Sequence, residues 1–290
     1  MRITRGLIRQ NSPSRSFGGN VAINILLLAF GCFMALPLVY AVSNAFKPFD
    51  ELWLYPPRFF PRIPTTKNFS DIFRLMANSQ VPFLRYVFNT LMISIVGTVG
   101  HVIIASMAAF AMAKMKFMGK DWMFRLVVLT LMFNTAVTVI PRYVIMSGLR
   151  LVDTYPSMIL PGLAGTLGLY LMKQFMEQMI PDSLLESARI DGAGEVRIFW
   201  SIVMPLVKPA WLTLTIFCFQ ELWNSGSSIL VYSENLKTFN YALSQILAGG
   251  IARAGAGSAA TVIMMLVPIL VFLVTQSNVV ETMSTSGMKD

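Results

Sequence analysis

Six long apolar segments constrain the fold of this chain more strongly than any other feature. They cover residues 21–43, 85–113, 122–146, 156–176, 202–223 and 258–280. A helix needs about 20 apolar residues to cross a hydrocarbon layer about 30 Å thick, because each residue adds about 1.5 Å. Charged residues make up only 13% of the 290 residues, whereas soluble domains contain about 25%. We therefore predict an all-α membrane protein in which six transmembrane helices form a single domain over residues 1–290.

The distribution of Lys and Arg predicts the orientation in the bilayer. Both residue types collect in short loops on the cytoplasmic side of membranes. They are concentrated in a predicted arm over residues 1–20 and in the segments after the second and fourth spans, which places both termini in the cytoplasm. The predicted outer loop 44–84 also contains several basic residues and argues against this orientation. Because orientation accounts for the net charge of +9, we predict no nucleic-acid partner.

A charged stretch over residues 181–201 separates the fourth and fifth spans. Its first part predicts a short helix that begins with a capping box, in which Ser183 and Glu186 bond each other's backbone N–H groups, and ends at Gly192. A second short helix is predicted from Glu195 to Trp200, presenting Val196, Phe199 and Trp200. Two short helices joined at a glycine would form a compact protrusion. An ordinary amphipathic helix at the membrane surface is the alternative interpretation.

At this stretch the sequence resembles the permease subunits of binding-protein-dependent ABC importers, in the carbohydrate-uptake branch related to the maltose permeases. The family signature is a Glu-Ala-Ala triplet, an Asp-Gly-Ala and a later Leu-Pro. The matching residues are Glu186, Ser187, Ala188, Asp191, Gly192, Ala193, Met204 and Pro205. Ser187 and Met204 are mild departures from this signature.

The resemblance implies a type I ABC importer permease with a cytoplasmic coupling-helix loop. In that family the loop docks on a cytoplasmic ATPase, with Ala188 and Gly192 allowing close approach and Glu186 and Asp191 bonding basic groups. The expected partners are a second homologous permease, two ATPase subunits and an extracytoplasmic sugar-binding protein. The expected location of this chain is the inner membrane of a bacterium. The expected substrate is an oligosaccharide.

No catalytic activity or cofactor is predicted for this chain. It contains no G-x-x-x-x-G-K-[ST] motif, and "MGKD" at 118–121 lacks both the loop and the Ser or Thr. ATP and Mg²⁺ are therefore expected in the partner subunits. A secondary transporter, a permease for another solute class and a membrane receptor remain alternatives.

Polar residues within the spans are candidates for the substrate pathway. Gln220, Trp223 and Asn224 share one helix face by their spacing, and Glu221 lies beside them. Amides can bind sugar hydroxyls, and an aromatic ring can cover the C–H surface of a pyranose. Asn89 and Asn134 are further candidates. For the residues over 220–224, the competing explanation is hydrogen bonding between helices, with Trp223 at the membrane interface. For Asn89 and Asn134, it is packing.

Other unusual residues in the spans have simpler explanations. His101 has no second metal-binding residue at suitable spacing, so we predict a neutral imidazole bonded to a neighbouring helix and no metal site. Gly162, Gly165 and Gly168 form a small-residue stripe that predicts close helix packing. Cys32 and Cys218 are expected to pack as small apolar groups rather than as a disulfide.

Overall fold

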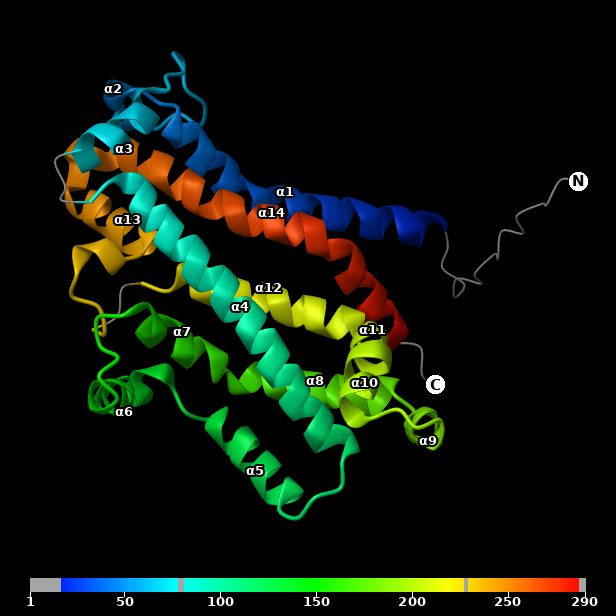
Figure 1. Ribbon diagram of the computed structural model, residues 1–290. Helices are drawn as coiled ribbons and strands as arrows, with labels where there is room; N and C mark the ends of the chain where they lie inside the picture. Colours follow the sequence, from blue (N-terminus) through cyan, green and yellow to red (C-terminus); the bar gives the residue numbers. More distant parts are fainter. Residues whose placement is uncertain (1–16, 78–80, 227–228, 287–290) are drawn as a thin grey trace, which may run out of the picture.

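A central helix organises the fold of the protein (Figure 1). The computed structural model describes residues 17–77, 81–226 and 229–286, in which every regular element is a helix. Helix α4 (Phe83–Lys114) packs against α7 (Tyr155–Leu163), α8 (Thr166–Met179) and α12 (Lys208–Asn224), and α1 (Phe17–Ala45) lies along α14 (Ala254–Ser286). The all-α prediction is confirmed. Residues 1–16 of the predicted arm lie outside the described residues.

Three single helices in the described part of the chain are long and apolar enough to cross a membrane. They extend over Gly18–Ala45, Phe83–Lys114 and Gly250–Thr275. The fifth predicted span, 202–223, belongs to a pair of helical segments, Glu195–Leu206 and Lys208–Asn224, bent by 81°. Pro209 has no N–H to donate to the carbonyl of Pro205, which weakens the helix at this turn and favours the bend.

The third and fourth predicted spans are each divided into two helices, and the number of six transmembrane helices stays a prediction. The third consists of α5 (Lys120–Thr130) and α6 (Thr135–Gly148), because the Asn134 side chain accepts a 2.9 Å bond from the N–H of Ala136 and begins a new helix. The fourth consists of α7 and α8. Gly165 separates them with a ψ of 110°, which is outside the helical region.

Short helices gather at the two ends of the molecule (Figure 1). One end carries α2 (Phe49–Leu52) and α3 (Lys67–Ala77), which form within the predicted loop 44–84, together with α13 (Phe239–Ala248) and the 3₁₀ turns η2 (Glu234–Leu236) and η3 (Gly250–Arg253). The other end carries α9 (Asp182–Ile190), α10 (Glu195–Ile198), a π-helical turn η1 (Phe199–Val203) and α11 (Met204–Leu206).

The predicted small-residue stripe is confirmed as a packing surface. A Cβ atom at Gly162 would lie 2.8 Å from Leu222 of α12, and a Cβ atom at Gly168 would lie 2.6 Å from Leu214 of the same helix. Gly97 of α4 also faces Leu222, where a Cβ atom would be 2.5 Å away. Such distances exclude larger side chains unless the neighbours shift. Glycine therefore lets α4, α7, α8 and α12 approach each other closely.

Candidate functional site

The predicted protrusion exists as two short helices, α9 and α10, joined at a glycine; we call residues 182–198 the α9–α10 knob. Gly192 has a φ of 81°, a conformation that side chains with a Cβ rarely adopt. The N–H of Gly192 donates to the carbonyl oxygen of Arg189 at 3.0 Å, and the N–H of Ala193 donates to the carbonyl oxygen of Ala188 at 3.0 Å. These two bonds close the end of α9. The predicted capping box is wrong. Pro181 precedes the first residue of α9 with no side-chain cap, and Ser183 already lies inside the helix.

One side of the knob packs against the rest of the subunit. Leu185 and Ala188 are buried in a core cluster with Met176, Ile198 and Phe199. The Ala188 side chain thus packs into the subunit's own core, whereas the family resemblance implied that it faces a partner. Phe199, predicted to be presented outward, is buried in the same cluster.

Two salt bridges hold the knob in place. Lys114 Nζ at the end of α4 lies 2.8 Å from Asp182 Oδ1, and this hydrogen bond lowers the pKa of the Asp182 carboxyl. Arg189 Nε and Glu195 Oε1 are 2.7 Å apart and connect α9 to α10 across Gly192. The hydrogen bond to Glu195 raises the pKa of the Arg189 guanidinium. The first salt bridge attaches the knob to α4, and the second holds α9 and α10 together within it.

Removal of the Asp182 charge is expected to loosen α9. A carboxyl whose pKa is lowered by folding stabilises the fold above its unfolded pKa of about 3.9, and this contribution is lost as the pH falls. In hydrogen exchange corrected for intrinsic rates, the α9 amides should lose protection as the pH falls from about 5 through the lowered pKa of Asp182. Asp182→Asn should reduce protection already at pH 5. Asp121→Asn, at an exposed position of α5, is the control and should behave as the wild type.

The opposite side of the knob exposes an unusual mixture of apolar and charged side chains. Ile190 is 86% exposed and Val196 73%. The side chains of Glu186, Ser187, Asp191 and Arg197 are also exposed. Sequence reasoning did not single out Ile190, although a lone isoleucine between Arg189 and Asp191 could have been noticed. The knob therefore offers both apolar and charged groups to a partner protein.

The residues predicted to line a pathway on α12 divide into two groups. Gln220, Glu221 and Asn224 are exposed along one face of the helix. Trp223 instead lies inside the subunit with 1% of its surface exposed, and its Nε1 donates a 2.8 Å hydrogen bond to the carbonyl of Met264 on α14. The competing explanation, a bond between helices, holds for Trp223.

The two remaining candidates occupy structural positions. Asn89 is fully buried, and its Nδ2 donates to the carbonyls of Asn235 at 2.8 Å and Lys237 at 2.9 Å. Its Oδ1 accepts a 2.8 Å bond from the Tyr155 hydroxyl. These bonds attach the 235–237 segment to α4. The Asn134 side chain is exposed and caps α6.

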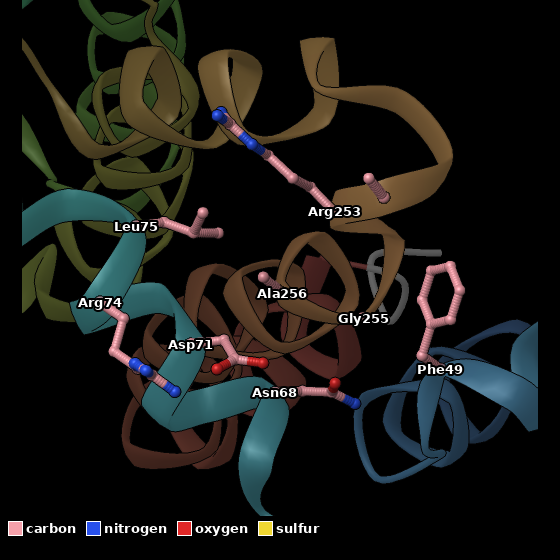
Figure 2. Close-up of a pocket in the computed structure, with 9 residues that line it drawn as sticks. Phe49, Asn68, Asp71, Arg74, Leu75, Arg253, Gly255 and Ala256 are labelled. Atoms are coloured by element: carbon pink, nitrogen blue, oxygen red, sulfur yellow. The ribbon is translucent and has the colours of Figure 1, made fainter. Parts of the chain in front are cut away.

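A polar pocket of about 490 Å³ opens at the end of the molecule that lies opposite the knob. Figure 2 shows Asn68, Asp71 and Arg74 of α3 on one side and Arg253 with the first turn of α14 on the other. Within the described part of the chain, none of these charged side chains forms a salt bridge. No group of three or more His, Cys, Asp or Glu residues that could hold a metal ion was found among the described residues.

Comparison with known proteins reveals extensive similarity. The family described as the inner membrane component of binding-protein-dependent transport systems matches residues 27–284. The sn-glycerol-3-phosphate transport system permease protein UgpE of Yersinia enterocolitica is 30% identical over 208 residues, which are 71% of this chain and 74% of UgpE. The polygalacturonan/rhamnogalacturonan transport system permease protein YtcP of Bacillus subtilis is 29% identical over 206 residues, 71% of this chain and 69% of YtcP.

A solved structure shares the fold over nearly the whole chain. It is a chain of a bacterial ABC transporter involved in the import of alginate, and it superimposes with a TM-score of 0.77 at 22% identity, covering 92% of this chain and 99% of that one. The family match begins within α1 and ends in the last turn of α14. This protein is therefore a multi-pass membrane protein that belongs to the family of binding-protein-dependent transport system inner membrane components.

Proposed function

We propose that this protein is the translocating subunit of an ATP-driven importer for oligosaccharides or polysaccharide fragments. The α9–α10 knob carries this proposal, because it combines the family signature residues with an outward surface that nothing in the subunit covers among the described residues. The knob docks on a cytoplasmic ATPase, with Ile190 and Val196 as apolar contacts and Glu186 and Asp191 as partners for basic groups. ATP and Mg²⁺ are bound by the ATPases.

The proposal extends to the other subunits of the importer. A second homologous permease completes the translocation path, which Gln220, Glu221 and Asn224 line from α12. The end of the molecule with the polar pocket faces the extracytoplasmic binding protein, and both termini are cytoplasmic. The name of one relative supports the substrate class, since YtcP is the permease of a polygalacturonan/rhamnogalacturonan transport system. The membrane is the inner membrane of a bacterium.

Charge reversal or an added charge on the knob should release the ATPase. Glu186→Lys and Ile190→Glu are each expected to lower the amount of ATPase recovered with the tagged permease by about tenfold or more. A hydrogen bond to a charged group contributes about 1.5–3 kcal/mol, and 1.4 kcal/mol corresponds to a factor of ten in affinity. The measurement is quantitative co-purification from membranes that contain all subunits.

Ile63→Glu is the matched control, because Ile63 is 72% exposed and lies in the 44–84 segment, at the end opposite the knob. It should retain the ATPase at the wild-type level. Undiminished recovery of the ATPase with both knob variants would rule out the docking role. A secondary transporter would co-purify with no ATPase even as wild type.

A further inference from the structure

Residues 53–62, which follow α2, fold back onto the end of α1 (Figure 1); we call them the 53–62 segment. The Lys47 ammonium, just beyond α1, donates a 2.6 Å hydrogen bond to the carbonyl of Arg58. The ring centroids of Phe59 and Tyr40 are 5.5 Å apart. Because Tyr40 lies inside α1, the segment runs alongside the helix and does not simply extend beyond it.

Further hydrogen bonds give the 53–62 segment a defined shape. The Ser43 hydroxyl of α1 donates to the carbonyl of Phe59. The Glu51 carboxylate accepts bonds from the N–H groups of Arg62 at 2.9 Å and Ile63 at 3.3 Å. The segment is therefore bonded both to α1 and to α2, which holds its exposed side chains in a defined arrangement.

The 53–62 segment lies on the side of α1 that faces away from the core of the subunit. Tyr40 and Ser43, which contact the segment, share one face of the helix by their spacing of three residues. Ala45 lies about 200° further round the helix than Ser43. It is fully buried in a core cluster that also contains Ala259 of α14. The segment therefore covers the face of α1 opposite the core.

The length of α1 indicates the depth of this contact in the membrane. The apolar part of the helix, residues 21–43, is about 35 Å long at about 1.5 Å per residue, slightly more than a hydrocarbon layer of about 30 Å. Tyr40 lies three residues, or about 5 Å, before the end of this part. The Phe59 ring beside it thus lies near the boundary between hydrocarbon and headgroups.

Large aromatic side chains are exposed on the 53–62 segment. Tyr55 is 91% exposed, Phe60 66% and Trp53 54%. Arg62 is exposed as well and forms no salt bridge with a described residue. The charge of Arg62 and the polar backbone of an irregular segment are costly in hydrocarbon, whereas removal of aromatic rings from water is favourable. The headgroup layer meets both requirements, and Trp and Tyr are enriched there.

We propose that the 53–62 segment is a lipid anchor in the headgroup layer of the leaflet at the end opposite the knob. Trp53, Tyr55 and Phe60 insert between phospholipid headgroups, and Arg62 lies beside their phosphates. Phospholipid is favoured over a partner protein because the apolar side chains of α1 below the segment are exposed too, so that the segment continues a surface that the bilayer covers. The anchor is independent of the knob and of what docks there.

Spin labels measure this depth in the complete complex in lipid nanodiscs, with the other subunits free of cysteine. Tyr55→Cys and Phe60→Cys carry the label after Cys32 and Cys218 are replaced by serine. Cys32 alone, exposed in the middle of α1, is the hydrocarbon reference, and Ser70→Cys, exposed on α3, is the water reference. Oxygen concentrates in hydrocarbon and a nickel chelate in water. The ratio of their collision rates at Tyr55→Cys and Phe60→Cys should lie between those of the two references.

Three results would overturn the anchor. A collision ratio equal to that of Ser70→Cys would place the 53–62 segment in water. Shielding of the labels from both reagents in the assembled complex would show that the second permease covers the segment. Labels that are in water until the binding protein is added, and are then shielded from both reagents, would identify a docking surface for that protein.

Lys47→Met tests how the 53–62 segment is held. The substitution removes the ammonium that bonds the Arg58 carbonyl, so the label at Phe60→Cys should gain mobility and move toward the collision ratio of the water reference. Lys67→Met, at an exposed position of α3, is the matched control and should leave the label unchanged. Equal behaviour of the two variants would show that Lys47 does not position the segment. If Lys47→Met does not assemble, the collision ratios with Lys47 intact decide the proposal.

Discussion

Replacement of Gly192 by valine is expected to lower binding-protein-stimulated ATP turnover and transport by about tenfold, with the permease still inserted in the membrane. Gly192 has a φ of 81°, and a residue with a Cβ loses about 1–2 kcal/mol in this region, more when it is β-branched. The chain can relieve this strain only by changing the angle between α9 and α10. The Arg189–Glu195 pair would then separate, and the exposed surface of the knob would be turned away from its partner.

Gly194→Val is the matched control. Both glycines have open space where a Cβ atom would be added, but Gly194 has a φ of −71° and a ψ of 156°, which any residue adopts. The control should keep transport and ATP turnover within about twofold of the wild type. Both activities would be measured in proteoliposomes that contain the complete complex and the binding protein. Equal effects of the two substitutions would show that backbone conformation at Gly192 is not what positions the knob.

Replacement of Trp223 is expected to lower the free energy of unfolding strongly. Met264 lies four residues before Pro268 in α14, so its carbonyl lacks the N–H that a regular helix would supply. The Trp223 Nε1 donates to this carbonyl at 2.8 Å instead. Trp223→Phe should cost about 1–3 kcal/mol, because the buried carbonyl loses its donor. Trp223→Ala should cost about 3–5 kcal/mol through the added loss of packing.

A double-mutant cycle isolates this hydrogen bond. Pro268→Ala restores an N–H at position 268, so Trp223→Phe should cost less in the Pro268→Ala background than in the wild type. Trp122→Phe, at an exposed position of α5, should change the free energy of unfolding by no more than about 0.5 kcal/mol. The free energies come from detergent-induced unfolding followed by circular dichroism. Additive effects of the two substitutions would contradict the role given to Trp223.

The candidate site was predictable where it depends on local sequence. The signature residues, the two short helices and the glycine between them all follow from neighbouring residues, and the structure contains them. The directions of individual side chains were less predictable. Helical spacing alone could not show that Ala188 and Phe199 face the core while Ile190 faces outward, because the α9–α10 knob is packed on Met176 and other residues of α8.

The sequence by itself determined the helical class, most of the apolar segments, and the position and turn of the α9–α10 knob. These properties depend on composition and on residues a few positions apart, such as the glycine that ends α9. Only the tertiary structure decided which polar residues are structural. The bond from Trp223 reaches a residue 41 positions away, and those from Asn89 reach residues 146 and 148 positions away. Whether a polar side chain in a membrane helix faces a pathway or another helix depends on such distant partners, which become neighbours only in the folded chain.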